Sequence, residues 1–465
     1  MADVSRNAFD QLDEKPFSRF HLLAMFTTGM GVFTDGYDLA SIGIVLPLVL
    51  TSFGIDHISG LMSGLLTGSA LVGSVFGAIL FGFLAQKGRK RFYGIDVAIM
   101  AAAAAAQVFA PNLWVLIAIR FVLGIGVGAD YVLSPTIMAE HANKKDRGKK
   151  LGFGFGAMWG FGAIAAALVL LLFQHLGVSH DLQWRIVLGG GAVPALSVLM
   201  LRLRMPETAR FLARVEGDGA AARDVIRDIT GTAAVPAPLV DTRPWHKLFA
   251  KHARGVLGAA LLWMVYDIVL YSGVLFGPSV IAEGLHVGEV GFTLISYLLL
   301  QSPGTLLGCA LVDRIGRRTL TAIGFGACGL GLLGFAPMLS TAAASPILTF
   351  AMFGLYNFAL SMGPGAISGA GLLGVELAPT RIRSIAQAFT VVGGRIGAAL
   401  AAFVFPELLG PIGKSGLMLL LAGVSIFGAV ITFFVVPETK GRSLEEINDD
   451  TDAALAAASP SAAAS

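Results

Sequence analysis

Two aspartates inside a long apolar stretch are the residues whose chemistry stands out. Asp35 and Asp38 lie in Gly31-Val-Phe-Thr-Asp-Gly-Tyr-Asp-Leu39, within the apolar segment 20–50, and a membrane-spanning helix needs only about 20 residues. A spacing of three places both carboxylates on one face of a helix. Because a carboxylate near the bilayer centre costs about 2.5–3.5 kcal/mol, each must face water, meet a partner or bind a proton. We interpret the pair as a proton site on a transport path; structural hydrogen bonding in a kinked helix is the alternative.

A second pair of charges lies in the apolar segment 112–139. Arg120 and Asp130 are ten residues apart, close to three helical turns, and therefore point to nearly the same side of a helix. An unpaired arginine is costly in a membrane. We expect Arg120 to pair with Asp130 or with one of the two aspartates of the first segment, and such pairing could be purely structural.

Candidate ligand-binding residues form a stripe in the segment 256–282. Trp263, Asp267 and Tyr271 recur at every fourth position and share one face of a helix. Packing alone would also place Trp and Tyr near the membrane interface. An aspartate between two aromatic rings at mid-span nevertheless favours a ligand site.

Arg395 and Trp159 add a charge and an aromatic surface. Arg395 is the only cation placed well inside the core of the second half of the chain. It could hold an anionic substrate or neutralise Asp267, and the two interpretations are equally supported. Trp159 stands alone in a segment rich in glycine and alanine. Pro364 and its glycine neighbours should break the segment 345–375, which would help alternating access.

The rest of the sequence must place these residues inside a membrane. The chain has 465 residues, of which 55% are hydrophobic and 14% charged, and its mean hydropathy is +0.76. This composition predicts an all-α polytopic membrane protein, and the continuous apolar runs exclude an outer-membrane β-barrel. No nucleophile–base set, metal-ligand cluster or cofactor motif is present, so we expect neither an enzyme nor a cofactor, metal or nucleic acid site. Twelve membrane spans are expected, over 20–50, 61–85, 92–110, 112–139, 150–174, 184–203, 256–282, 290–312, 319–340, 345–375, 385–408 and 414–436.

Charges in the loops set the expected orientation. Basic residues gather in the loops of one side, while the opposite loops carry only Lys414. The positive-inside rule therefore predicts a multi-pass protein of the inner (plasma) membrane with both termini in the cytoplasm. The long polar loop 204–255 could contain a short amphipathic helix over 220–229. The Ala/Ser/Pro-rich tail after Asn448 should be disordered, and we expect a monomer.

Three short motifs recur at nearly one offset along the chain. Tyr37-Asp38 recurs as Tyr266-Asp267, Gly88-Arg-Lys90 as Gly316-Arg-Arg318, and Pro206-Glu-Thr208 as Pro437-Glu-Thr439, at offsets of 229, 228 and 231 residues. A common offset predicts two pseudo-symmetric six-helix halves that rock about a central site at the membrane midplane. The expected domains are an N-terminal segment 1–19, a first half 20–203, a linker loop 204–255, a second half 256–437 and a tail 438–465.

At these motifs the chain resembles the major facilitator superfamily over its whole length except the tail. The general marks are Gly82-Phe-Leu-Ala-Gln-Lys-Gly-Arg-Lys90, Asp313-Arg-Ile-Gly-Arg-Arg318, Pro206-Glu-Thr-Ala-Arg210 and Pro437-Glu-Thr-Lys-Gly-Arg-Ser-Leu-Glu-Glu446. Narrower marks resemble the phosphate:proton symporter branch, and these are Phe33-Thr-Asp-Gly-Tyr-Asp-Leu39, Tyr93-Gly94, Gly124-Ile-Gly-Val-Gly-Ala-Asp-Tyr131 and the stripe of Trp263, Asp267 and Tyr271. That resemblance implies proton relay by aspartates and substrate contact by the stripe and by Tyr131.

The chain also departs from that branch. Trp159 and Gly365 stand where the branch has a glutamine and an asparagine, so two polar donors to phosphate are missing. Arg395 in a Gly-Arg-Ile-Gly setting resembles the aromatic-acid:proton branch, and the Pro-Glu-Thr motifs resemble those of sugar porters. Gln86 stands near the place of a signature aspartate. We therefore expect a weakened latch between the second and eleventh spans.

These observations predict a proton-coupled symporter that takes up a small anionic solute, inorganic phosphate or a small organic anion, by alternating access. The alternatives are a sugar or polyol carrier of the same superfamily and a membrane sensor that binds a solute without moving it. The expected proton-relay residues are Asp35, Asp38, Asp130 and Arg120. The expected substrate-binding residues are Tyr131, Trp159, Trp263, Asp267, Tyr271 and Arg395.

Overall fold

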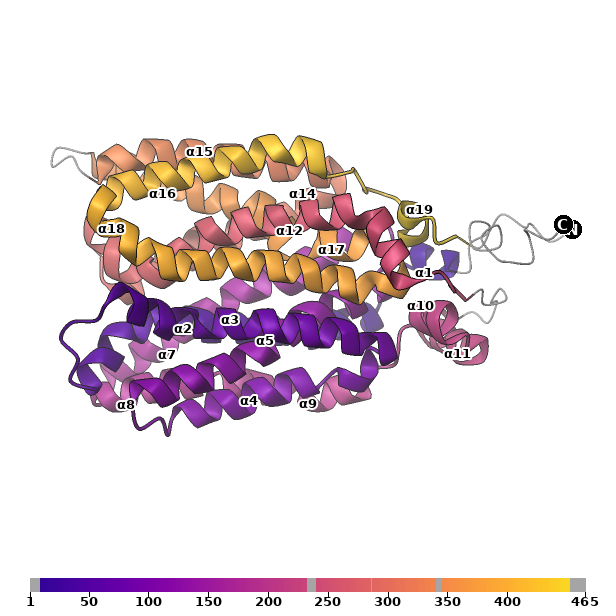
Figure 1. Cartoon of the computed structure of the whole chain (residues 1–465), viewed down its shortest axis with the longest axis horizontal. Coiled ribbons are helices and arrows are strands. Elements are labelled where there is room, and N and C mark those ends of the chain that lie inside the picture. The colour runs from indigo at the N-terminus through magenta and orange to yellow at the C-terminus, as the bar shows by residue number, and fades with distance from the viewer. Residues whose placement is uncertain (1–8, 232–239, 286, 340–344, 452–465) are drawn as a thin grey trace, which may run out of the picture.

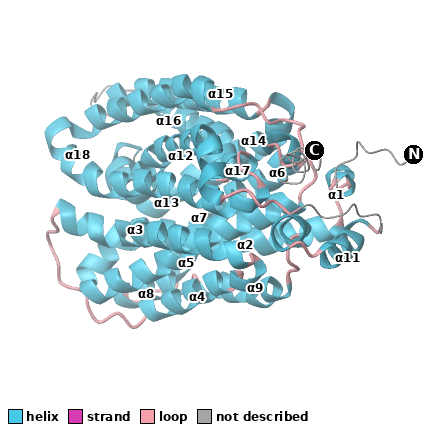
Figure 2. Cartoon of the chain, turned by 45° about the vertical axis from the view of Figure 1, so that its right-hand side comes forward, coloured by secondary structure: helices cyan, strands magenta, loops and turns pink. Residues whose placement is uncertain are grey.

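The computed structural model describes residues 9–231, 240–285, 287–339 and 345–451. Within these ranges the regular structure is helical, and the long helices run side by side as one bundle (Figure 1; Figure 2). The predicted disordered tail falls largely on 452–465, outside the described residues. The helices are α1 (Asp10–Glu14), α2 (Arg19–Ser52), α3 (Gly60–Leu84), α4 (Ile95–Gln107), α5 (Leu113–His141), α6 (Arg147–Leu151), α7 (Met158–His175), α8 (His180–Gly189), α9 (Ala192–Arg204), α10 (Ala209–Phe211), α11 (Gly219–Thr230), α12 (Trp245–Phe276), α13 (Glu289–Leu294), α14 (Ser302–Ile315), α15 (Arg317–Met338), α16 (Pro346–Leu360), α17 (Leu372–Glu376), α18 (Arg383–Val435) and α19 (Leu444–Asn448).

The bundle contains the twelve predicted membrane spans. Ten helical segments of the described chain are long and apolar enough to cross a bilayer. The helix α4 is shorter, at 13 residues. The helix α18 has 53 residues and holds two spans that meet at Gly413, whose φ of 67° and ψ of 176° are not helical. Adding α4 and dividing α18 gives twelve spans, so the predicted all-α fold is confirmed.

One boundary differs clearly from the prediction. The seventh span was expected to begin at residue 256, but α12 already begins at Trp245. The first turns of α12 carry lysines, histidines and an arginine. These residues suit a helix that extends beyond the bilayer, but their low hydropathy led to the prediction of a loop. Leu248 anchors this extension, because it is buried against Ala378 and Ile382.

The two halves of the chain lie on opposite sides of the bundle, with the helices from α2 to α9 below and those from α12 to α18 above in Figure 1. The repeated motifs have the same role in each half. Glu207 accepts a hydrogen bond from the backbone N–H of Lys90 at 3.0 Å, and Glu438 accepts one from that of Arg317 at 3.0 Å. Each Pro-Glu-Thr glutamate therefore binds the basic turn of its own half, as the common offset predicted.

The helix that follows α16 widens where a break was predicted at Pro364. Ser361–Gly369 forms a π-helix and not an open loop, which is a way for a helix to accommodate a proline that lacks an N–H. A second π-helix, Gly152–Ala157, lies in the first half. The two meet across the interface, because a Cβ built at Gly156 would lie 3.3 Å from the carbonyl oxygen of Gly365. Glycine thus lets the two halves approach closely beside their shared interior.

A small cap covers one end of the bundle, which we call the terminal end because α1 and α19 lie there (Figure 1; Figure 2). The predicted amphipathic helix over 220–229 is confirmed as α11, which buries Ala222, Ile226 and Ile229. Its apolar face packs in one cluster with Phe9 and Leu12 from the chain's beginning. The interior of the cap is therefore apolar, although the sequence around it is polar.

Arg210 joins the cap to both ends of the chain. Its Nη2 donates to Asp13 Oδ1 at 2.9 Å and its Nε donates to Glu445 Oε1 at 2.7 Å. Its Nη1 donates to the backbone carbonyl of Glu140 at 2.6 Å. Burial raises the pKa of Asp13 to about 6, against the opposing charge of Arg210, so the stability of the cap should depend on pH.

We expect the chain to gain stability from Asp13 as the pH falls from about 7 to about 4. The pKa of Asp13 is higher in the folded chain than its ordinary value of 3.8, so the folded state binds the proton more readily in this window. Asp13→Asn should remove a pH-dependent contribution of about 1–3 kcal/mol. Melting temperatures across this window test this, with exposed Glu14→Gln as control. Equal pH slopes for Asp13→Asn and the unmodified chain would contradict the prediction.

Candidate functional site

Six side chains identified from the sequence surround one cavity between the two halves. Its volume is about 30 Å³, which is room for about one or two water molecules. An open ligand pocket has about 300–1,000 Å³, so the site is contracted in this conformation and must open to take a solute. The six residues are Tyr131 of α5, Trp159 of α7, Trp263, Asp267 and Tyr271 of α12, and Arg395 of α18.

Arg395 provides the positive charge of the cavity. Its Nη1 donates to the Tyr271 hydroxyl at 2.7 Å and lies 3.5 Å from Asp267 Oδ2. Its guanidinium group lies over the Tyr131 ring, 4.2 Å from the centroid, a cation–π contact. The separation from Asp267 exceeds the about 2.7–2.9 Å of a charge-assisted hydrogen bond. Arg395 is therefore positioned mainly by Tyr131 and Tyr271 and is only loosely paired with Asp267. Its guanidinium group can lie beside that carboxylate and still bind a ligand.

Trp159 provides an aromatic wall of the cavity. Its ring centroid lies 5.6 Å from that of Tyr297 and 6.3 Å from that of Tyr271. Trp263 packs against Tyr131 at 5.9 Å, so rings from both halves enclose the cavity. Tyr297 was not identified from the sequence, where it lies in an unremarkable apolar run without a charged neighbour.

Gly365 does not enlarge the cavity, although replacing an asparagine by glycine would be expected to free volume. A Cβ built at Gly365 would lie 3.3 Å from the Tyr266 hydroxyl, and one at Gly369 would lie 2.7 Å from Tyr266 Cε1. The ring of Tyr266 therefore occupies the space beside both glycines. A larger side chain at either position would have to displace that ring.

The predicted relay residues do not line the cavity, and two of them, Asp35 and Asp38, lie on one face of α2. Gly31, Asp35 and Asp38 are spaced by four and three residues and so share that face. Both carboxylates are fully buried, and their oxygens have no hydrogen-bond partner among the described residues. The charged neighbours of Asp35 include Arg395 and Asp130, whereas Asp38 has Arg120 as its charged neighbour. Asp35 is therefore the aspartate of α2 whose charge acts on Arg395 of the cavity.

Asp130 has a partner that was not identified from the sequence. Arg202 Nη1 lies 2.6 Å from Asp130 Oδ1 and 2.6 Å from Asp96 Oδ2, and its guanidinium group stacks on the Tyr93 ring at 4.5 Å. This cluster packs so closely against Gly31 that a Cβ built at Gly31 would lie 1.9 Å from Arg202 Nη2. Arg202 and Asp96 are charges near the ends of predicted spans, a signal that could have revealed them.

The predicted ion pair of Arg120 is not formed. Within the described ranges no carboxylate lies within ion-pair distance of Arg120, whose Nη1 donates to Gln107 Oε1 at 3.3 Å. The prediction was wrong for Asp130 because that carboxylate binds Arg202. Asp38 instead packs against the turn between α8 and α9, where a Cβ built at Gly191 would lie 1.9 Å from its Oδ1.

Buried ion pairs close the terminal end beneath the cavity. Glu140 of the first half lies 2.8 Å from Arg89 Nη2 and 2.7 Å from Arg383 Nη1 of the second half. The second and eleventh spans are still in contact at the place of the predicted weakened latch, and the weakening itself stays a prediction. Gln86 Nε2 donates to the Ser384 hydroxyl at 2.6 Å, which replaces the missing aspartate.

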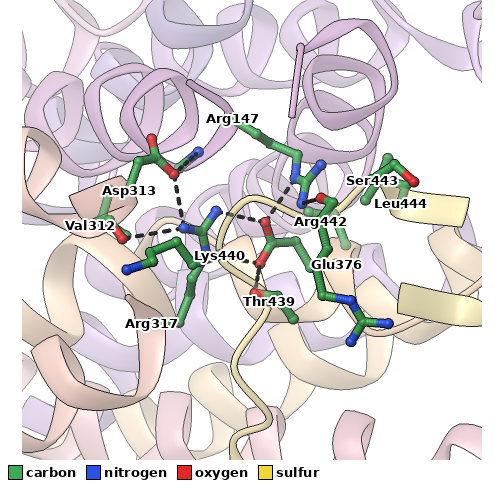
Figure 3. Close-up of polar contacts among 12 residues, drawn as sticks. Arg147, Val312, Asp313, Arg317, Glu376, Thr439, Lys440, Arg442, Ser443 and Leu444 are labelled. Atoms are coloured by element: carbon green, nitrogen blue, oxygen red, sulfur yellow. Dashed lines mark hydrogen bonds and ion pairs between the residues drawn. The ribbon is translucent and has the colours of Figure 1, made fainter. Parts of the chain in front are cut away.

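Glu376 forms the matching cluster in the second half (Figure 3). Its carboxylate lies 2.7 Å from Arg147 Nε of the first half and 2.9 Å from Arg317 Nη2, and it accepts from the Thr439 hydroxyl at 2.6 Å. Glu376 and Glu140 were not identified from the sequence. Their 236-residue separation could have revealed them, since it lies close to the offset of the repeated motifs.

Glu376→Gln is expected to open the terminal end. Breaking a buried pair on one side costs about 3–5 kcal/mol, and here it weakens a contact between the halves. The native Cys309 reports on this opening, because it is 4% exposed and packs against Gly152 of the other half. Alkylation of Cys309 should accelerate at least about tenfold, while buried Cys328 stays unmodified. An unchanged rate, as expected for exposed Glu216→Gln, would contradict the prediction.

Comparison with known proteins agrees with this architecture. Residues 24–450 match the family described as "Sugar (and other) transporter". Inorganic phosphate transporter 1-11 of Oryza sativa subsp. japonica is 31% identical over 95% of this chain and 90% of its own length. Low affinity inorganic phosphate transporter 4 of Medicago truncatula is 33% identical over 95% and 94%.

A solved structure shares the fold. The proton:xylose symporter XylE, bound to 6-bromo-6-deoxy-D-glucose, superposes with a TM-score of 0.78 and covers 93% of this chain and 99% of its own. Its sequence identity is 21%, so it supports the fold alone. The family match extends from the beginning of α2 to the cap and includes both halves and the cavity between them. This chain therefore belongs to the sugar (and other) transporter family of the major facilitator superfamily.

Proposed function

We propose that this transporter couples inward proton flow to the uptake of a small anion, with inorganic phosphate as the first candidate. The observation that carries the proposal is the loosely paired Arg395 in the cavity, 3.5 Å from Asp267. An anion can take the place of that carboxylate, since a guanidinium group has donors left for oxygen ligands. Two relatives above 30% identity that carry the name of phosphate transporter support the choice of anion.

The proposed proton path runs along one face of α2 and ends on α5. Asp38, near Arg120, would take up the proton, Asp35 would pass it toward the cavity, and Asp130 would complete the relay. Asp35 has both Arg395 and Asp130 as charged neighbours, so its charge acts on the group that would hold the anion. Such contact between a proton site and a substrate site is what coupling requires.

A small organic anion is the second candidate. The indole ring of Trp159, against which Tyr297 packs at a tilt of 49°, offers a flat apolar surface to the cavity, which suits an organic group better than bare phosphate. A neutral sugar fits less well, because it would leave Arg395 with only the loose pairing to Asp267. A sensor that moves no solute would bind but show no counterflow.

Proteoliposome uptake at acid outside pH separates these candidates. Radiolabelled phosphate uptake that requires the pH gradient supports the first, and carboxylate uptake without phosphate uptake supports the second. In the second case Trp159→Gln should weaken carboxylate transport about 3- to 10-fold, the scale of a lost aromatic contact. If both substrates are excluded while sugar enters, the anion proposal fails.

The expected topology and assembly complete the proposal. The terminal end would face the cytoplasm of a cell with this protein in its inner (plasma) membrane, as the positive-inside rule predicts. The chain would act as a monomer with the halves 20–203 and 256–437, joined by the linker 204–255. Protease sensitivity of the cap in inverted vesicles tests the orientation.

A further inference from the structure

A crevice of about 370 Å³ opens between the two halves near the terminal end, apart from the central cavity. One wall comes from the beginning of α2, from α6 and from the π-helix Gly152–Ala157, and the other comes from α14. Its apolar lining includes Met25, Phe153 and Leu306. Leu306 is 40% exposed on a membrane-spanning helix, so the crevice opens toward the lipid.

The crevice contains a buried lysine whose amino group makes no hydrogen bond or ion pair among the described residues. Lys150 is 3% exposed, and its amino group has no hydrogen-bond partner among the described residues. That nitrogen lies 5.6 Å from the centre of the Phe17 ring. The nearby carboxylate of Asp146 is not within ion-pair distance and instead accepts from Asn143 Nδ2 at 3.4 Å. Because a buried ammonium group is costly when unpaired, the site favours an anion.

We propose that this crevice binds an acidic phospholipid, with the phosphate group on Lys150 and an acyl chain along the apolar wall. The burial of this lysine in a crevice with an apolar wall favours a lipid over a free anion, because a free anion would leave that wall uncovered. The exposed side chain of Lys149 lies at the same crevice and adds a second positive charge for the headgroup.

The two walls of the crevice are held together by contacts between the halves. The backbone N–H groups of Gly148 and Lys149 donate to Asp313 of α14, at 3.2 and 2.7 Å. When the terminal end opens, these contacts and the crevice separate. A lipid that binds only the closed crevice therefore stabilises the conformation closed at the terminal end.

Native mass spectrometry of the full chain tests the proposal, with phosphatidylglycerol and phosphatidylcholine of the same acyl chains as probes. We expect phosphatidylglycerol to be retained about tenfold better, the scale of one hydrogen bond to a charged group. Lys150→Gln should abolish this preference. Lys145→Gln, in the same loop but not at the crevice, should keep it.

A second pair of variants covers the case in which Lys150→Gln does not fold. Ala310→Trp fills the crevice without changing charge and should displace phosphatidylglycerol, whereas Leu307→Trp, exposed on α14 but outside the crevice, should not. Equal retention of the two lipids would overturn the proposal. So would displacement of phosphatidylglycerol by an equal concentration of inorganic phosphate, which would assign the crevice to a free anion.

Discussion

Arg395→Lys is expected to reduce anion affinity by about 30-fold or more. Removing one partner of a buried, hydrogen-bonded charge pair costs about 2–5 kcal/mol. Lysine keeps the charge but cannot both lie flat on the Tyr131 ring and donate to the Tyr271 hydroxyl, as Arg395 does at 4.2 and 2.7 Å. Equilibrium binding of radiolabelled phosphate to the purified chain measures the change.

A matched control separates loss of binding from loss of fold. Arg223→Lys, exposed on α11, should leave affinity unchanged. Affinity should also stay low when Arg395→Lys is combined with Asp267→Asn, because removing the nearby carboxylate does not restore the guanidinium contacts. Phosphate binding at the level of the unmodified chain in Arg395→Lys would exclude Arg395 as the anion site.

Asp38→Asn is expected to abolish proton-driven accumulation while leaving substrate exchange. Asparagine has nearly the same shape as aspartate but can neither take up nor release a proton. A gradient of about 2 pH units is worth about 2.7 kcal/mol per proton, which corresponds to about hundredfold accumulation of substrate. In Asp38→Asn the ratio of internal to external substrate should fall to about one. Accumulation in proteoliposomes and counterflow without a gradient measure the two activities separately.

Asp35→Asn provides an internal comparison for the relay. It should also uncouple transport, but it should change substrate affinity as well, since Arg395 is among the charged neighbours of Asp35 and not of Asp38. Asp56→Asn, in the loop after α2 and exposed, should do neither. If Asp38→Asn still concentrates substrate under an imposed gradient, the relay assignment is wrong.

Most of the fold could be predicted from local properties of the sequence. Apolar runs of membrane-spanning length define helices because the bilayer leaves no other way to satisfy the backbone. The repeated Pro-Glu-Thr and basic-turn motifs predicted two equivalent halves, and Glu207 and Glu438 hold equivalent turns. Helix ends were less predictable, as at Trp245, because a helix can continue into water without a change in hydrophobic pattern.

Partners in the interior could not be predicted in the same way. Arg120 and Asp130 share a helix face, and that periodicity suggested a pair, yet Asp130 binds Arg202 at 2.6 Å from another helix. Helical spacing determines which residues face inward but not which helix lies opposite. The same reason explains why Tyr266, and not empty space, lies beside Gly365.

By itself, the sequence determined that this protein is a helical membrane transporter of two related halves, with carboxylates on α2 and an arginine in the second half's core. Hydrophobic length, repeat offset and the cost of charge in lipid are sufficient for these conclusions. Only the tertiary structure decided that six predicted residues share one cavity, that Glu140 and Glu376 join the halves, and that Lys150 is buried in a crevice. Each of these depends on how helices distant in sequence pack together, which no local pattern encodes.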